Sequence, residues 1–536
     1  MGISRLFFYI SLLAFAFFSH LALGSLKNYE QFYFSYLLLF GALLALRCLN
    51  HKIFLLISWL LFLTSLGYLP SGLLYGAPSI GVAASVYETN PTEALGYFKT
   101  IPLSTYAFAL LYVTNFALLL FLHRKTKNFF NTPCSFRRKI SGFYLLALIA
   151  YSAFVLSQPL APFQQTVQIG EQKYRYDFYP ATFVSQVIKV NNDYFSQRAL
   201  FNQAIHAQPQ WQIESVQPRH QNNVLIIGES MRRDYLSLYG YPVSTTPFLS
   251  QVKGQVFDLY VAAGPNTQPS LQRSLYRSEN QHQTTVYTDN IISLAKAAGF
   301  HTYWLSNQGK MGEYDTMAAR IAVQADQHFF TSKGDYTFGN TPDSALLPEL
   351  DKALQQASSQ PKLIVLHLMG SHPPFCDRVE AQQAAREYPT ISAEMSCYLA
   401  SLKQTDDLLA QIQQRLQQQN QSYSVLYFSD HGLAHLGEGK DLTMLNNKEF
   451  KQSYAVPLVV FDSEAQRQTR IQNPQSAFNF MDGFAQWLGI KESHLNQQDF
   501  FNPPTQSIKV FDWHGLVDYD SLKEDPALRF KSLEVR

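Results

Sequence analysis

Five stretches within the first 160 residues are each about as long and as apolar as a helix that crosses a membrane. A spanning helix needs about 20 mostly apolar residues, because the hydrocarbon layer of a bilayer is roughly 30 Å thick. The five stretches cover residues 6–24, 32–49, 53–75, 104–123 and 141–160. The sequence therefore predicts a bundle of five transmembrane helices over residues 1–160.

The first stretch also has the form of a signal peptide. Arg5 precedes an apolar run that ends in Ala22-Leu23-Gly24, where small residues are typical of a cleavage site. Further apolar stretches follow at once, which favours an uncleaved anchor.

Basic residues next to these stretches predict the orientation of the chain in the membrane. Cytoplasmic loops carry an excess of Lys and Arg. The loop between the fourth and fifth stretches contains six such residues: Arg124, Lys125, Lys127, Arg137, Arg138 and Lys139. Arg47 and Lys52 flank the link between the second and third stretches, which falls on the same side. We expect an N-terminus inside the cell and a multi-pass membrane protein whose polar part lies outside. In a Gram-negative bacterium this membrane is the inner membrane and the outside compartment is the periplasm.

Composition changes after about residue 158, where apolar residues give way to Gln, Asn and Ser. Only 15% of all residues are charged and the formal net charge is +2, whereas ordinary soluble domains contain about 25% charged residues. These values argue against a disordered chain, a coiled coil and a basic protein with a nucleic-acid partner. We expect a transmembrane domain at 1–160, an amphipathic connector at the membrane surface at 161–222 and a polar domain at 223–536.

The outside loop 75–102 contains the polar run Glu88-Thr89-Asn90. A solvated loop is the simpler interpretation of this run. The functional alternative is a polar lip at which Glu88 and Asn90 contact a lipid headgroup.

The connector contains apolar residues at helical spacing. These residues are Phe183, Val187, Val190 and Tyr194. The spacing indicates an amphipathic helix, either at the bilayer surface or packed on the polar domain.

In the polar domain, short apolar runs of strand length alternate with helical patterns. The runs cover residues 224–227, 363–366, 425–428, 457–461 and 508–511. Helical patterns cover residues 291–298 and 391–419. This alternation predicts an α/β domain with a largely parallel sheet, in which the functional site lies beyond the carboxyl ends of the strands.

Three of these runs end in polar residues that bind metals. Glu229 follows the first run, and Asp430-His431 follows the run at 425–428. The run at 363–366 ends in His367 and continues to His372. Carboxylates and imidazoles are the ligands that zinc takes outside cysteine sites. A single acidic residue at a strand end is more often a helix cap, but the joint arrangement indicates a metal site.

A hydroxyl nucleophile is available beside this site. Thr267 precedes a predicted helix at 271–277, and Pro269 suits its first turn. Backbone N–H groups at a helix N-terminus favour a phosphate. On spacing alone, a helix cap is the simpler interpretation of Thr267.

These motifs, in this order, resemble those of the bacterial inner-membrane phosphoethanolamine transferases, which belong to the alkaline phosphatase/sulfatase superfamily. The resemblance covers nearly the whole chain. Besides the five apolar stretches, it rests on residues 88–94, 224–230, 239–247 and 429–432. It implies an alkaline-phosphatase-like fold for the polar domain.

The resemblance also implies the roles of individual residues. Glu229, Asp430 and His431 would hold one zinc ion, with a second ion left open. Thr267 would face the same ion and act as the catalytic nucleophile.

Further residues are expected to contact the substrate. His372 matches the family histidine near the substrate phosphate, and Asn266 lies next to Thr267. Family members often carry a further histidine roughly a dozen residues after Asp-His-Gly, but residues 442–448 contain none. His435 is nearer and is the candidate to replace it. Glu88 and Asn90 match the family loop.

Many family members have several cysteine pairs, whereas this chain has four cysteines. Cys48 falls in a membrane stretch and Cys134 in the cytoplasmic loop. Cys376 and Cys397 share the oxidising side, where disulfides persist. We expect them to form a disulfide that anchors the loop after His372, with two free thiols as the alternative.

The implied reaction transfers phosphoethanolamine from phosphatidylethanolamine to a cell-envelope glycoconjugate through a phosphoethanolamine-threonine intermediate. Lipopolysaccharide core or lipid A is the favoured acceptor, and a periplasmic glucan is the alternative. The enzyme is expected to act as a monomer among membrane lipids.

Three other functions fit parts of the sequence. Residues 267–273 are similar to the sulfatase motif, but threonine cannot yield the formylglycine that sulfatases use. A glycerol-phosphate transferase using phosphatidylglycerol shares the five-helix plan, although the loop at 88–90 favours ethanolamine. An inactive scaffold is disfavoured by the complete set of Glu229, Thr267, Asp430 and His431.

Overall fold

The chain divides into two compact units. The computed structural model describes residues 2–25, 29–74, 76–78, 82–83, 86–87, 98, 101–131, 134–157, 178–204, 207–279, 284–308, 317–331, 341–390, 392–513 and 515–530. The helical unit comprises Met1–Tyr87 and Ile101–Gln197, and the α/β unit comprises Glu88–Thr100 and Arg198–Arg536.

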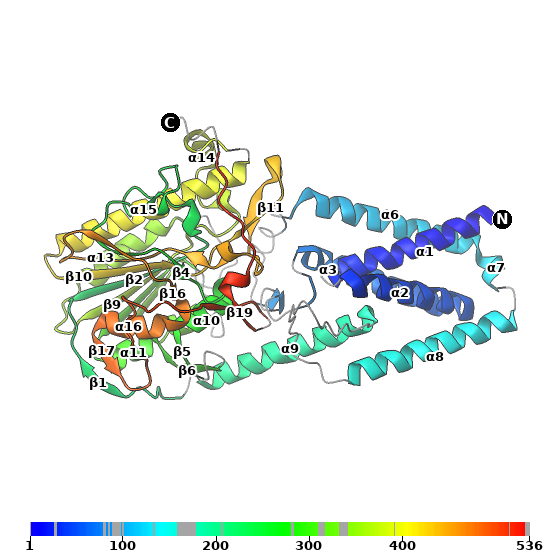
Figure 1. Cartoon of the computed structure of the whole chain (residues 1–536), viewed down its shortest axis with the longest axis horizontal. Helices are drawn as coiled ribbons and strands as arrows, with labels where there is room; N and C mark the ends of the chain where they lie inside the picture. The colour runs from blue at the N-terminus through cyan, green and yellow to red at the C-terminus, as the bar shows by residue number, and fades with distance from the viewer. Residues whose placement is uncertain are drawn as a thin grey trace. The chain divides into compact units, whose positions relative to one another are not determined.

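The helical unit is built from long helices (Figure 1). They are α1 (Gly2–Ala22), α2 (Tyr29–Leu49), α3 (His51–Leu74), α6 (Leu103–Lys125), α8 (Ser135–Ser157) and α9 (Tyr179–Ala204), with the short α7 (Lys127–Asn131) between α6 and α8. Each of the five predicted spans falls on a helix. Within the described residues, α1, α3 and α6 are long and apolar enough to cross a membrane, and α2 contains a shorter apolar stretch, Phe34–Leu49. Five crossings therefore stay a prediction.

Helix α1 packs against its neighbours through aromatic rings and hydroxyl groups. The ring of Phe15 stacks on Tyr112 of α6 at 5.8 Å. The Tyr112 hydroxyl lies 2.8 Å from Ser19 Oγ of α1 and 2.6 Å from Ser65 Oγ of α3. Polar groups in lipid need such internal partners, so these bonds tie three helices together.

The predicted connector helix is present as α9. Its residues Tyr179 and Phe183 are buried against Leu23 and the ring of Tyr68, whose centroid lies 5.1 Å from that of Phe183. This part of α9 therefore packs on the other helices of the helical unit. The sequence pattern indicated the bilayer surface or the polar domain instead. The position of α9 at the bilayer surface stays a prediction.

The α/β unit contains an eight-stranded sheet in the order β15-β3-β14-β10-β2-β9-β7-β8. The strands are β2 (Asn222–Gly228), β3 (Gly254–Phe257), β7 (His301–Ser306), β8 (Gln327–Phe330), β9 (Lys362–His367), β10 (Tyr423–Ser429), β14 (Leu458–Asp462) and β15 (Gln468–Ile471). The pairing between neighbours makes β14 antiparallel to the other seven described strands. The largely parallel sheet is as the alternation predicts.

Smaller strand groups lie outside this sheet. They are β1 (Ile213–Val216) with β17 (Ile490–Glu492), β5 (Tyr276–Glu279) with β6 (Thr284–Asn290), β11 (Ala434–Leu436) with β12 (Thr443–Leu445), β4 (Tyr260–Val261) with β13 (Ala455–Val456) and β16 (Gln475–Ser476), and β18 (Lys509–Phe511) with β19 (Leu516–Asp518). The predicted strand at 508–511 therefore belongs to a two-stranded ribbon and not to the main sheet.

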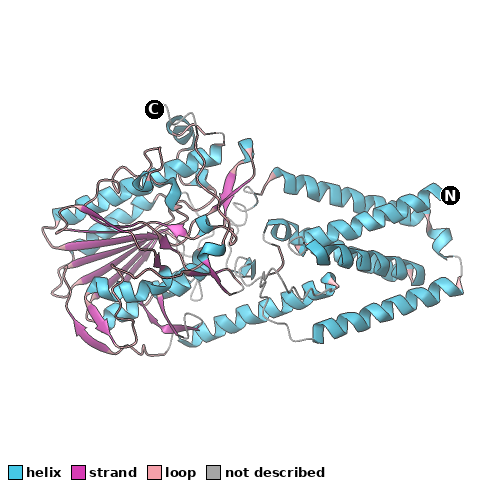
Figure 2. Cartoon of the chain, in the orientation of Figure 1, coloured by secondary structure: helices cyan, strands magenta, loops and turns pink. Residues whose placement is uncertain are grey.

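Helices cover both faces of the main sheet (Figure 2). Alternate residues of a strand point to opposite faces. Ile226 accordingly packs in the cluster with α13 (Leu347–Gln355) and α15 (Ala393–Gln418). Ile227 packs in the cluster with α10 (Thr267–Ser274), α11 (Ile291–Ala297) and α16 (Phe480–Leu488). Strands buried on both faces read as continuous apolar runs, which is why 224–227 and 425–428 are recognisable in the sequence.

Short helices complete the α/β unit. They are α12 (Met317–Ala322) and α14 (Ala381–Glu387), with 3-10 turns at Arg233–Tyr235, Ser237–Tyr239, Asp343–Leu346, Phe375–Asp377, Gly439–Asp441, Lys451–Ser453, Ala477–Asn479 and Tyr519–Ser521.

Candidate active site

Two neighbouring parallel strands bring the acidic strand ends together. β2 and β10 pair in register, so that Gly228 lies opposite Ser429. The next residue of each strand is an acid, Glu229 or Asp430. Both carboxylates therefore lie at the edge of the sheet where sites of open α/β folds form.

Glu229, Asp430 and His431 form a compact group of potential metal ligands. His431 Nε2 lies 3.1 Å from Glu229 Oε1 and 3.6 Å from Asp430 Oδ2. One ligand atom from each residue lies within 4.8 Å of the others, and all three residues are buried. Among the described residues, no other group of three His, Cys, Asp or Glu side chains meets this criterion.

The Thr267 hydroxyl points at the same group. Its Oγ1 lies 3.1 Å from Glu229 Oε2, to which it donates a hydrogen bond, and 3.3 Å from His431 Nε2. Thr267 is the first residue of α10, and Asn266 occupies the N-cap position. The helix-cap interpretation of Thr267 is therefore wrong: α10 begins four residues earlier than expected, which turns the hydroxyl toward the carboxylate.

Burial and mutual charge shift the pKa values of this group. Burial raises the pKa of Asp430 well above its ordinary value, and the nearby charge of Glu229 raises it further. Burial also acts to raise the pKa of Glu229, but the charge and hydrogen bond of His431 outweigh it and lower that pKa. For His431, the two carboxylates outweigh burial and raise the pKa to about 9. In the metal-free protein, these shifts favour protons on Asp430 and His431, and a cation bound by the three residues would take the place of these protons.

The hydrogen bonds leave one Asp430 oxygen unused. Asp430 Oδ1 accepts from the backbone N–H groups of Ser230, at 3.2 Å, and His431, at 2.7 Å. Asp430 Oδ2 is buried and has no hydrogen-bond partner. Buried polar atoms are nearly always paired, so this oxygen indicates a missing partner. Two carboxylates, an imidazole and a hydroxyl are donors that suit zinc, and the residues therefore fit the expected metal.

The segment after β9 places His372 near these residues. The backbone N–H of Ser371 donates to the Glu229 carbonyl at 3.0 Å. His372 is close enough for its charge to contribute to the lowered pKa of Glu229, and its Nδ1 lies 2.6 Å from the Pro373 carbonyl oxygen, to which it donates. Cys376 and Cys397 form a disulfide that joins this segment to α15.

His435 occupies a different environment from the one expected of a substrate contact. Its Nδ1 lies 2.8 Å from Asp525 Oδ1, and its Nε2 lies 2.6 Å from the Tyr235 hydroxyl. Both ring nitrogens thus have protein partners. Glu88 and Asn90 lie outside the described residues.

Two site residues were missed by the sequence analysis. Gln308 Nε2 donates to the Leu368 carbonyl at 2.9 Å and lies 3.5 Å from Glu229 Oε2. Asp343 accepts from the backbone N–H groups of Met369 and Gly370, at 2.8 and 2.9 Å, and so holds the segment that leads to His372. Gln308 follows β7, so recognising 301–306 as a strand would have placed it at the functional edge.

Comparison with known proteins identifies the family. The sulfatase family profile matches residues 221–490. OpgE of Escherichia coli K12, a phosphoethanolamine transferase, is 37% identical over 80% of this chain and 79% of its own length. The chain belongs to the phosphoethanolamine transferases. The expected enzyme class and superfamily are confirmed, which removes the inactive scaffold from the alternatives.

Solved structures show the fold of this transferase. The integral membrane protein EptA of Neisseria meningitidis matches with a TM-score of 0.55 at 16% identity, over 93% of this chain and 98% of its own. The C-terminal periplasmic domain of Escherichia coli EptC, in complex with Zn, matches with a TM-score of 0.51 at 23% identity, over 59% of this chain and 98% of its own. The combination of a membrane part with a sulfatase-like α/β domain is therefore the family fold.

Proposed function

We propose that this transferase moves phosphoethanolamine from phosphatidylethanolamine to a glycolipid of the bacterial cell envelope, with Thr267 as covalent carrier. The observation that carries the proposal is the Thr267 hydroxyl, 3.1 Å from Glu229 and 3.3 Å from His431, beside the unpartnered Asp430 oxygen. The family supports the group that is transferred. The donor, the acceptor and the roles of the residues are our inference.

Glu229, Thr267, Asp430 and His431 are the proposed ligands of one zinc ion. When bound, zinc acts as a Lewis acid that lowers the pKa of a ligating hydroxyl and stabilises negative charge on a phosphoryl group. Hydrogen bonds already orient two of these ligands: Ser230 Oγ donates to Glu229 Oε1 at 2.7 Å, and backbone N–H groups hold Asp430 Oδ1. Such outer partners set ligand geometry in metal sites.

In the proposed first step, Thr267 Oγ1 attacks the phosphorus of the donor. Its proton passes to Glu229 Oε2, the atom that accepts its hydrogen bond. The bond from phosphorus to the diacylglycerol oxygen breaks, and a proton from His372 Nε2 reaches the departing oxygen. Diacylglycerol leaves, and phosphoethanolamine remains bonded to Thr267.

In the second step, an acceptor hydroxyl or phosphate oxygen attacks the same phosphorus. The proton of an acceptor hydroxyl passes to His372 Nε2, and with a phosphate acceptor His372 regains its proton from water. The bond from phosphorus to Thr267 breaks, and the threonine oxygen regains a proton from Glu229. The backbone N–H groups at the start of α10 favour the phosphoryl group in both steps. Asn266 is the proposed donor contact beside Thr267, and Glu88 and Asn90 are the proposed headgroup contacts.

The metal proposal is tested by removing one ligand. Asp430→Ala in the full-length enzyme should lose bound zinc, measured by elemental analysis, together with transfer activity. Ser463→Ala, which alters a hydroxyl at the opposite end of β10, serves as the control and should keep both. Full activity of wild-type protein stripped of metal would end the metal proposal.

The acceptor is proposed to be lipopolysaccharide core or lipid A. Mass spectrometry of lipopolysaccharide and of periplasmic glucans from a deletion strain, with and without the wild-type gene restored, separates the two classes. Loss of phosphoethanolamine from lipopolysaccharide supports the proposal, whereas loss from glucans alone replaces the acceptor. The mass of the missing group also separates phosphoethanolamine from glycerol phosphate.

A further inference from the structure

Arg232 lies three residues after Glu229 and its side chain is completely buried. Its backbone N–H donates to the Tyr398 hydroxyl at 2.9 Å. A Cβ atom added to Gly432 would come within 3.3 Å of Arg232 Cγ and 2.1 Å of the Gln452 carbonyl oxygen. The turn after Glu229 and the turn after His431 therefore meet where the Arg232 side chain passes Gly432.

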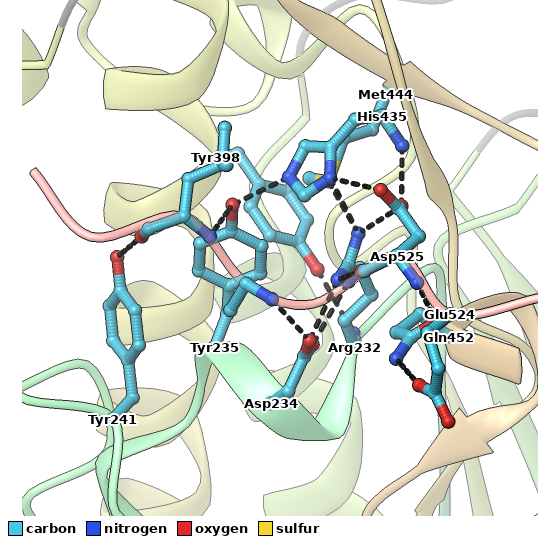
Figure 3. Close-up of polar contacts among 12 residues, drawn as sticks. Arg232, Asp234, Tyr235, Tyr241, Tyr398, His435, Met444, Gln452, Glu524 and Asp525 are labelled. Carbon is cyan, nitrogen blue, oxygen red and sulfur yellow. Dashed lines mark hydrogen bonds and ion pairs between the residues drawn. The ribbon is translucent and has the colours of Figure 1, made fainter.

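The buried guanidinium donates to Asp234, two residues later, and to Asp525, near the C-terminus of the chain (Figure 3). Asp234 accepts two hydrogen bonds, from Nε at 2.9 Å and Nη2 at 2.7 Å. Asp525, almost three hundred residues later, accepts from Nη1 through Oδ2 at 3.0 Å and from Nη2 through its carbonyl oxygen at 2.5 Å. A buried charge that loses such a partner is strongly unfavourable, so Arg232 depends on Asp525.

Asp525 also holds His435, in the β11–β12 hairpin that follows Asp430 and His431. It accepts from the His435 backbone N–H at 2.8 Å and from Nδ1 at 2.8 Å. His435 Nε2 lies 2.6 Å from the Tyr235 hydroxyl, and this hydroxyl accepts from the Leu528 N–H at 3.0 Å.

These bonds form one continuous chain from the C-terminal segment, residues 523–530, through Tyr235 and His435 and back to Asp525. The segment is anchored at further points: Ala527 N–H donates to Asp234 at 2.7 Å, and Asp525 N–H donates to the Gln452 side chain at 2.8 Å. The Asp525 carboxylate contacts both the turn after β2, at Arg232, and the hairpin after β10, at His435.

We propose that Asp525 is a positioning residue of the active site, which fixes the distance between Glu229 and the Asp430-His431 pair by binding Arg232 and His435. His435 then serves as a link in this support and not as a substrate contact. The inference rests on the proposed function because it takes these three residues as metal ligands.

The test compares Asp525→Asn with Glu524→Gln in the full-length protein. Both changes remove one carboxylate charge, but Glu524 is 61% exposed and pairs with Lys451 away from Arg232. Partners of metal ligands typically contribute 10- to 100-fold in metal affinity. Asp525 acts one step further from the ligands, so Asp525→Asn should weaken Co²⁺ binding about tenfold, the lower end of that range, and change the cobalt absorption spectrum. Glu524→Gln should match the wild type in both.

Hydrogen exchange supplies a readout that needs no metal. In metal-free protein, Asp525→Asn should speed amide exchange about tenfold or more in peptides covering 228–236 and 430–446, because local opening becomes easier. Glu524→Gln should leave these peptides protected. If the wild type binds no metal, the proposed function fails, and hydrogen exchange alone then decides whether Asp525 supports the two turns.

A second pair of variants covers the case in which Asp525→Asn does not fold. Tyr235→Phe removes the hydroxyl between Leu528 and His435, whereas Tyr241→Phe removes a hydroxyl that donates to the Leu528 carbonyl. Tyr235→Phe should shift exchange, or cobalt binding where the wild type binds cobalt, in the same direction, and Tyr241→Phe should not. If Asp525→Asn folds, metal affinity and amide exchange equal to those of the wild type would overturn the inference. If Asp525→Asn does not fold, the same result for Tyr235→Phe would overturn it.

Discussion

The reactivity of the Thr267 hydroxyl depends on the residues around it. A threonine hydroxyl is a weak nucleophile until a base or a metal activates it, and here it donates to the buried carboxylate of Glu229. Asn266 takes the N-cap position of α10, which frees the Thr267 side chain from capping. The nucleophile assignment therefore rests on an arrangement of three residues from three segments.

Substituting Thr267 tests the covalent route directly. Thr267→Ala should fold and insert normally but transfer at a rate lower by about a thousandfold or more. Thr267→Ser should keep part of the activity, since the hydroxyl remains while the methyl group that restricts its rotamer is lost. Intact-mass analysis after incubation with labelled phosphatidylethanolamine and no acceptor should show one added phosphoethanolamine in the wild type and none in the Ala variant. Near-normal transfer by Thr267→Ala would require direct transfer between the two substrates.

His367, at the end of β9, makes stability depend on pH. Burial lowers the pKa of His367 to about 4, against an ordinary value of about 6.5. Because the unfolded chain binds this proton more readily, stability is present above about pH 6.5 and is lost as the pH falls toward 4. This group lowers the free energy of unfolding by about 3 kcal/mol over that pH range.

Denaturant unfolding of the full-length protein between pH 7 and pH 4 measures this effect. His367→Gln should show a pH dependence that is weaker than that of the wild type by about 3 kcal/mol over this range. His494→Gln is the control, because the side chain of His494 is 31% exposed, whereas that of His367 is buried. Equal slopes for His367→Gln and the wild type would contradict a buried neutral imidazole.

At the scale of elements, the segment between β9 and α15 must pass close to Glu229. Gly370 has a φ of +49°, and a Cβ atom there would lie 2.9 Å from the Glu229 carbonyl oxygen and 3.0 Å from its backbone nitrogen. Asp343 holds the same segment through two backbone N–H groups. Close approach of backbones explains the glycine.

Gly370→Ala should push this segment away from Glu229 and lower the transfer rate about tenfold or more, since small displacements at a reacting centre are costly. Gly299→Ala is a matched control, because Gly299 also has a positive φ, +85°, but a Cβ atom added there would meet no other atom within 4 Å. Its transfer rate should stay within about twofold of the wild type, with a stability loss of about 1 kcal/mol from the backbone. Transfer rates and thermal unfolding distinguish the two effects, and equal rates for both variants would contradict the crowding at Glu229.

At the scale of the whole molecule, basic residues at the end of α6, in α7 and at the start of α8 predict the orientation of every part. Six Lys and Arg residues gather there and favour the cytoplasmic side. With five crossings, the chain after residue 160 emerges outside. A reporter enzyme that works only outside the cytoplasm should be active when fused after residue 160 and inactive when fused after residue 130. Strong activity of a cytoplasmic reporter after residue 160 would reverse the predicted topology.

Features that depend on neighbours in the chain could be predicted from the sequence. Apolar runs located the helices of the membrane part and four strands of the main sheet, because burial on both faces leaves a continuous apolar signature. The rule that sites lie beyond parallel strand ends brought Glu229, Asp430 and His431 together before any distance was known. Spacing also placed Thr267 and His372 near this site, and the family motifs then assigned their roles.

Which distant groups meet became clear from the three-dimensional fold alone. β14 runs antiparallel to its neighbours, and β7 carries Gln308 to the site, although neither is marked by a motif. Two hundred residues or more separate His435 from Tyr235 and Arg232 from Asp525. A hydrogen bond needs its two atoms within about 3 Å, and residue spacing along the chain carries no such information. For that reason the residues that carry the chemistry are readable in the sequence, whereas the residues that hold them in place emerge from the way the chain folds.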